Sequence, residues 1–204
     1  MGRFKIKKQD TFIDMTPMSD VMVLLLTFFM LTANFVKEEP VKVNTPGSVS
    51  EVKIPESNLL TIFVEKGGKV FMTMDSPEAM TKLGKQMNTS GELNLNAQQM
   101  QSFAEVPTFG TPINVVSQWL SLDNSERNKY LTSGVNEGIP CDSTNNELTV
   151  WVKAARTACG ENMRIAIKAD KDTPYKVIKR VMDSLRSIDE NRYNLITALK
   201  TGEE

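Results

Sequence analysis

The sequence predicts a single N-terminal transmembrane helix followed by a small α+β domain on the far side of the membrane. Three observations lead to this fold class. Residues 21–36 hold no charge, and apolar residues alternate with others in residues 58–74 on both sides of a Gly-Gly pair. Further along the 204-residue chain, prolines recur at positions that suit the first turn of a helix. An uncharged apolar run indicates a membrane helix, whereas strand-like alternation around Gly-Gly indicates a β-hairpin.

Composition excludes several function classes. The chain has 24 basic and 25 acidic residues and a formal charge of -1, so its overall charge does not drive nucleic-acid binding. A mean hydropathy of -0.27 excludes a protein with many membrane spans. Histidine is absent and there are only two cysteines. We therefore expect no enzymatic activity, no catalytic or metal site and no cofactor.

The membrane segment is predicted to extend upstream of the uncharged run. Sixteen helical residues cover only ~24 Å, whereas the hydrocarbon core of a bilayer is ~30 Å thick. Thr16 suits a helix cap and Pro17 a first-turn position, which predicts a helix from about Thr16 to Val36 that carries Asp20. A signal peptide, a buried helix of a soluble domain, and an inert anchor with Asp20 at the interface are the alternatives.

The basic residues fix the predicted orientation. Arg3, Lys5, Lys7 and Lys8 all precede the helix, and the positive-inside rule then places the N-terminus in the cytoplasm. The predicted organisation is a cytoplasmic tail over 1–14, the membrane helix over 15–36, an extended linker over 37–57 and the exported domain over 58–204.

Asp20 is the residue in the span most indicative of function. A carboxylate inside a membrane is costly and usually faces a partner or a water-filled cavity, where it can gain and lose a proton. Thr27 and Asn34 follow at heptad spacing, so the three residues nearly share one helix face. Alternatively, Thr27 bonds to its own helix backbone and Asn34 lies at the interface.

The exported domain is predicted from turn and cap signals. Strands over 58–65 and 69–74 form a hairpin, and helices begin at Ser76-Pro77 and run over 111–119 and 146–158. A C-terminal strand–helix–strand unit then follows. Its first strand is indicated by the alternation of Ile165 and Ile167. Thr173 is predicted to cap the following helix, with Pro174 in the first helical position and an apolar face formed by Val177, Ile178, Val181 and Leu185. Residues 192–199 are predicted to form the last strand.

Three segments resemble parts of the ExbD/TolR family of biopolymer transport proteins. Residues 13–26, IDMTPMSDVMVLLL, resemble its transmembrane signature of Thr-Pro followed by an intramembrane Asp. Residues 163–183 are similar to its C-terminal strand, loop and helix. Residues 41–47 are similar to its linker element, which adds as a strand to a partner, although Thr45 stands where the family has Leu.

The resemblance implies a proton-driven motor. ExbD-like proteins dimerise, insert into a pentameric ExbB-like membrane protein, carry protons on the intramembrane Asp and pass work through a periplasmic domain to TonB. This assigns the proton role to Asp20, a pore-facing position to Thr27 and Asn34, and partner binding to Val41, Val43 and Pro46. Alternatives are a TolR-like role in envelope maintenance, a tethered periplasmic binding protein with an inert anchor, and a linker that is only an extended tether.

The stretch from about 87 to 143 is longer than the family norm. It is rich in Asn, Gln and Ser, and either binds a specialised partner or decorates the common fold. Cys141 and Cys159 lie 18 positions apart on either side of the 146–158 helix. In an oxidising compartment we expect a disulfide between them, with two unpaired thiols as the alternative.

Overall fold

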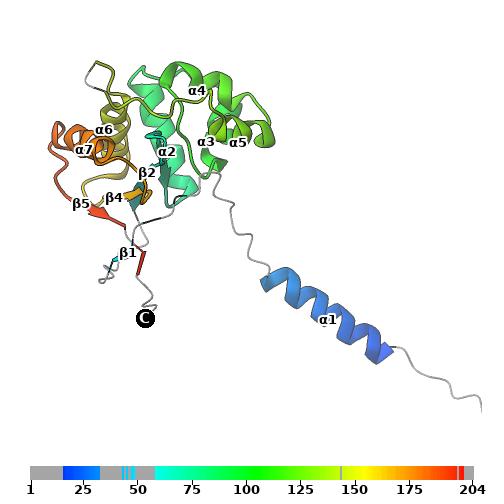
Figure 1. Cartoon of the computed structure of the whole chain (residues 1–204). Coiled ribbons are helices and arrows are strands. Elements are labelled where there is room, and N and C mark those ends of the chain that lie inside the picture. The colour runs from blue at the N-terminus through cyan, green and yellow to red at the C-terminus, as the bar shows by residue number, and fades with distance from the viewer. Residues whose placement is uncertain are drawn as a thin grey trace, which may run out of the picture. The chain divides into compact units, whose positions relative to one another are not determined.

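The computed structural model describes residues 16–32, 43, 45, 47–48, 58–142, 144–196 and 198–199. The chain divides into two compact units, Met1–Lys37 and Glu38–Glu204. The first unit contains helix α1, Thr16–Thr32 (Figure 1). Among the described residues, no helix combines the length and the apolar character needed to cross a membrane. The predicted helix end at Val36 lies outside the described residues.

A four-stranded mixed sheet organises the second unit, in the order β3-β2-β4-β5. Strands β2, Leu59–Val64, and β3, Val70–Met74, form the predicted hairpin. In its turn the Gly68 amide donates to the Glu65 carbonyl at 2.8 Å, and the φ of 86° at Gly68 favours glycine. Strands β4, Arg164–Ala169, and β5, Tyr193–Leu195, continue the sheet in parallel with β2.

The strand register builds one continuous apolar face. Ile62 of β2 stands opposite Met72 of β3 and Ile167 of β4, and all three are fully buried. Helices α2, Pro77–Thr89, α6, Glu147–Cys159, and α7, Tyr175–Arg186, supply the other part of the core (Figure 1). The mixed α+β class predicted for this domain is confirmed.

Local caps explain where two of these helices begin. The Ala79 amide donates to Ser76 Oγ at 3.2 Å, and the Thr149 amide donates to Asn146 Oδ1 at 3.4 Å. The predicted start of α7 is wrong by one residue, because Pro174 rather than Thr173 is the N-cap. The Thr173 hydroxyl instead donates to the Val64 carbonyl at 3.4 Å and ties this loop to β2.

The C-terminus forms two short strands instead of the single strand predicted over 192–199. β5 joins the main sheet, whereas β6, Ala198–Leu199, pairs in parallel with β1, Gly47–Ser48. The backbone bond from Ile196 to Ile167 ends the pairing with β4. The chain thus leaves the main sheet after this point and meets the end of the linker.

The segment predicted as an insertion is an integral part of the core. It contains α3, Ala97–Glu105, α4, Ile113–Leu120, and α5, Asn124–Thr132, of which only α4 was expected. Phe103, Phe109 and Trp119 from this segment are almost completely buried. Phe109 lies 4.7 Å from the Trp151 ring of α6 and pairs through its backbone with Met72 at the edge of β3.

Candidate functional site

Asp20 is the single charged residue of α1. The large apolar side chains from Met18 to Leu31 surround it along the helix and are between 51% and 87% exposed. A helix that is apolar on every side belongs in a membrane or inside a larger assembly, because water would otherwise contact all of that surface. The carboxylate is therefore an isolated ionisable group on an unpartnered apolar helix.

Two threonines of α1 bond to the backbone of their own helix. The Thr27 hydroxyl donates to the Leu24 carbonyl at 3.0 Å, and the Thr32 hydroxyl donates to the Phe28 carbonyl at 2.8 Å. This bond is the one that the alternative interpretation of Thr27 expects, and a pore-facing position of Thr27 stays a prediction. Asn34 lies outside the described residues, so the stripe of Asp20, Thr27 and Asn34 stays a prediction. The helix begins at Thr16, with Pro17 in its first turn, as expected.

One predicted linker residue packs on the folded domain. Val43 is half-buried and contacts the hydrophobic core, and Thr45 is also half-buried. Val41 and Pro46 lie outside the described residues. Since Gly47–Ser48 then pairs with the C-terminal strand, this end of the linker is anchored on its own domain, and partner binding by it stays a prediction.

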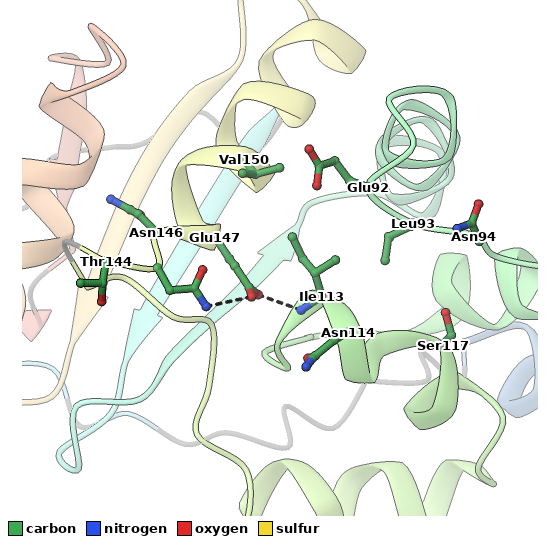
Figure 2. A pocket seen from close by; sticks show the side chains of 11 residues that line it. Glu92, Leu93, Asn94, Ile113, Asn114, Ser117, Thr144, Asn146, Glu147 and Val150 are labelled. Carbon is green, nitrogen blue, oxygen red and sulfur yellow. Dashed lines mark hydrogen bonds between the residues drawn. The ribbon is translucent and has the colours of Figure 1, made fainter.

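A polar cavity of about 720 Å³ lies where the insertion meets the start of α6 (Figure 2). Glu147 occupies its centre: Oε2 accepts the Ile113 amide at 2.7 Å and Oε1 accepts the Asn145 side-chain amide at 3.2 Å. The walls add Asn94, Asn114 and further amide and hydroxyl groups. The Glu147 carboxylate accepts the first backbone amide of α4 and thereby joins α4 to α6, and the polar groups of the cavity walls come mainly from neutral side chains.

Sequence reasoning missed Glu147. Its only signal is an acidic residue in the first turn of a predicted helix, which is a common helix-stabilising position. Within the described parts of the chain, no group of histidine, cysteine or acidic side chains could hold a metal ion.

The structure corrects the predicted disulfide. Both thiols are free, Cys141 buried and Cys159 half-buried. The backbone of Cys141 forms a β-bridge with Asn146, just before α6, whereas Cys159 is the last residue of that helix. Since Cys141 lies beside Asn146 and the 13 residues of α6 rise by ~20 Å, the two cysteine Cα atoms lie well beyond the ~7 Å that a disulfide can bridge.

Burial raises the pKa of the Cys141 thiol above 9.0, and neighbouring Asp142 raises it further against the lowering effect of Arg180. Burial is also the main cause that raises the pKa of the Cys159 thiol; Lys82 opposes it, Asp75 adds to it, and Arg156 opposes it. Both thiols are therefore protonated near neutral pH.

Comparison with known proteins gives one family. A family model described as biopolymer transport protein ExbD/TolR matches residues 7–199. A protein of Vibrio cholerae named biopolymer transport protein exbD2 is 34% identical over 59 residues, which are 29% of this chain and 44% of that relative. The chain thus matches less than half the length of this relative. No solved structure matches the chain.

Proposed function

Because the chain belongs to the ExbD/TolR family of biopolymer transport proteins, we propose that it is an ExbD-like subunit of an inner-membrane motor driven by the proton motive force. Members of this family are transport motor subunits rather than enzymes. In this proposal the motor energises TonB-dependent transport across the outer membrane, and Asp20 carries the protons.

One observation carries the proposal: Asp20 is the sole ionisable side chain on a helix whose other long side chains are apolar and exposed. Proton transfer inside a membrane requires an ionisable group that a partner or a water-filled cavity shields from lipid. One charge crossing 100 mV releases about 2.3 kcal/mol, so a sizeable conformational change needs several protons.

The proposal includes a topology and a set of partners. Residues 1–14 are cytoplasmic, residues 15–36 span the inner membrane and the following domain is periplasmic. An ExbB-like pentamer surrounds the membrane helices of two copies of this chain. The pentamer supplies the other groups that relay the proton. The periplasmic domain passes work to a TonB-like protein. The apolar surface of α1 is consistent with such a lining of partner helices.

The deciding experiment replaces Asp20 by Asn in the full chain and measures energy-dependent uptake through an outer-membrane receptor. Asn keeps the size and polarity but cannot be ionised, so uptake should be lost while membrane level and co-purification with the multi-span partner persist. Ser19→Ala is the matched control, because it removes an exposed hydroxyl of the same helix to which no role in proton transfer is assigned. Unchanged uptake in Asp20→Asn would refute the proposed role in energising outer-membrane transport.

The same strains separate the two motor roles. If uptake is normal but Asp20→Asn makes the cells sensitive to detergents, the chain acts as a TolR-like subunit for envelope maintenance. If an unrelated span without an acid replaces residues 1–36 with no loss of either phenotype, the helix is an inert anchor.

A further inference from the structure

The cavity at the start of α6 carries negative charge that no basic side chain balances. Glu92 and Glu147 both line it, and its lining contains no lysine or arginine. None of the ion pairs found among the described residues includes either carboxylate. The positive N-terminal end of α4 offsets part of the charge on Glu147, which still leaves the cavity net negative.

The Glu147 carboxylate lies inside this cavity. Its two hydrogen-bond partners, the Ile113 amide at 2.7 Å and the Asn145 side chain at 3.2 Å, belong to lining residues themselves. Figure 2 shows the Glu147 side chain in the space between α6 and the start of α4. A carboxylate has about four acceptor positions, so about two remain free. The group is therefore held in place and can still accept bonds from a ligand.

Apolar side chains lie beside the two carboxylates. We call the site the Glu147 cavity and define it by Glu92, Leu93, Ile113, Glu147 and Val150. Leu93 is buried, and Ile113 and Val150 are half-buried. In Figure 2 the exposed Glu92 side chain points toward Val150. An alkyl chain thus finds apolar contacts next to groups that bind a cation.

The charge of the surrounding segment acts in the same direction. The stretch from 87 to 143 holds six acidic residues, whereas its basic residues are Arg127, which is buried, and Lys129. Such an excess of one sign attracts ligands of the opposite sign over a distance and repels anions. The volume of about 720 Å³ lies within the range of about 300–1,000 Å³ that is usual for small-ligand sites.

We propose that the Glu147 cavity binds a primary ammonium group on an alkyl stem. The three donors of an ammonium suit acceptors that lie in several directions, and the stem contacts Ile113 and Val150. A metal ion would leave this apolar wall without a contact, and the described residues include no group of three metal-binding side chains. The ammonium comes either from a lysine of another protein or from a small amine. This inference is independent of the proposed motor role, because no residue of α1 takes part.

The test measures thermal unfolding of the full chain in a non-ionic detergent with the probe N-acetyl-lysine amide. For a Kd of about 1 mM, a concentration of about 10 mM should raise the Tm of the 167-residue unit by about 3–6 °C. N-acetyl-norleucine amide has the stem without the charge, and calcium chloride has the charge without the stem; both should give much smaller shifts. No shift with the lysine probe, or an equal shift with either control, overturns the proposal.

A peptide with one central Lys between Ser and Gly residues separates the two sources. A Kd at least tenfold lower for the peptide than for N-acetyl-lysine amide indicates a lysine of another protein, whereas equal values indicate a small amine. Both results support an ammonium site, and the absence of binding by either probe refutes it.

Variants test the two carboxylates. Glu147→Gln keeps an oxygen that can accept the Ile113 amide but removes the charge, so the Kd of the lysine probe should rise at least tenfold. Glu92→Gln changes an exposed side chain and should fold normally, with a Kd about three- to tenfold higher. If Glu147→Gln does not fold, an unchanged Kd in Glu92→Gln refutes the proposal.

Glu105→Gln is the matched control, because Glu105 is an exposed acid of the same segment that does not line the Glu147 cavity. Its Kd should stay within about twofold of the unmodified protein. Equal weakening by Glu105→Gln and Glu92→Gln would mean that the general charge of the segment, and not this cavity, attracts the amine, and the proposal would fail.

Discussion

Gly110→Ala tests whether the insertion is part of the domain core. The bridge between Met72 and Phe109 places Gly110 opposite Phe71 across the edge of β3. A Cβ atom at position 110 would lie 2.2 Å from Cδ1 of the Phe71 ring and 2.9 Å from its Cγ. The Phe71 ring thus occupies the space above this glycine, and one added methyl group measures how tightly the two segments are packed.

The expected cost follows from the burial of Phe71. The ring is completely buried, so it cannot swing into solvent and must shift within a packed core or push the 109–111 backbone away from β3. Overpacking of this kind costs about 1–3 kcal/mol. For the 167-residue unit, a loss of about 2 kcal/mol lowers the Tm by about 4–8 °C.

The assay is thermal and urea unfolding of the full chain in detergent, followed by circular dichroism. Gly134→Ala is the control, because an added Cβ there meets no atom within 4 Å and the position lies in the same insertion. It should change the free energy of unfolding by less than about 0.5 kcal/mol. Equal stability of the two variants would refute the packing of the insertion on the sheet.

A double mutant identifies the contact responsible. Phe71→Leu alone should destabilise the domain by loss of buried ring atoms. In the Gly110→Ala background the smaller Leu leaves room for the new methyl group, so the two costs should sum to more than the measured cost of the double mutant. Additive costs would mean that Gly110 is constrained by something other than Phe71.

Three further measurements follow from the described contacts. Glu190→Gln should lower the free energy of unfolding by about 1–3 kcal/mol, because Glu190 accepts two hydrogen bonds of 2.5 Å from Arg156. The side chains of this pair are only 15% (Glu190) and 25% (Arg156) exposed. Asp172→Asn, which breaks the exposed ion pair with Lys66, should cost less than about 0.5 kcal/mol in the same urea titration. Alkylation by iodoacetamide at pH 7 should be slow at both thiols and slower at buried Cys141 than at Cys159, and faster labelling of Cys141 would contradict its burial. Because the pKa of the Cys141 thiol is raised in the folded state, the folded protein keeps this proton at a pH at which the unfolded chain has lost it. The thiol therefore contributes stability that is fully present below pH 9.0 and is lost as the pH rises above it. Cys141→Ser should reduce this loss when the free energy of unfolding is measured against pH.

The sequence predicted those parts of the fold that local signals determine. The Gly67-Gly68 turn and the alternation of Leu60, Ile62 and Val64 predicted the hairpin, because both depend on neighbouring residues. Ser76 and Asn146 marked helix starts for the same reason. The start of α7 was displaced by one residue, since either Thr173 or Pro174 can occupy the cap.

Helices α3 and α5 were missed because they are mostly polar and bury few side chains. In α3 only Phe103 is buried, so the hydrophobic period is weak, although the capping box of Asn96 and Gln99 was a usable signal. In α5 the buried residues are Arg127 and Leu131. No sequence pattern reveals a buried arginine, because its burial depends on the tertiary fold, in which the Trp119 side chain of α4 donates to the Arg127 carbonyl.

The insertion also restricts how this domain can accept another strand. It closes the free edge of β3: Phe109 and Met72 exchange two backbone bonds of 2.7 and 2.9 Å, and the Ile139 amide donates to the Val70 carbonyl at 2.8 Å. Gly138 permits this approach, since a Cβ there would lie 2.8 Å from the Val70 nitrogen. In the described part of the main sheet, the outer edge of β5 is the one left without a neighbouring strand. A partner that binds by strand addition to this sheet must therefore pair along Tyr193–Leu195, where three residues limit the number of backbone bonds and side-chain contacts must supply the specificity.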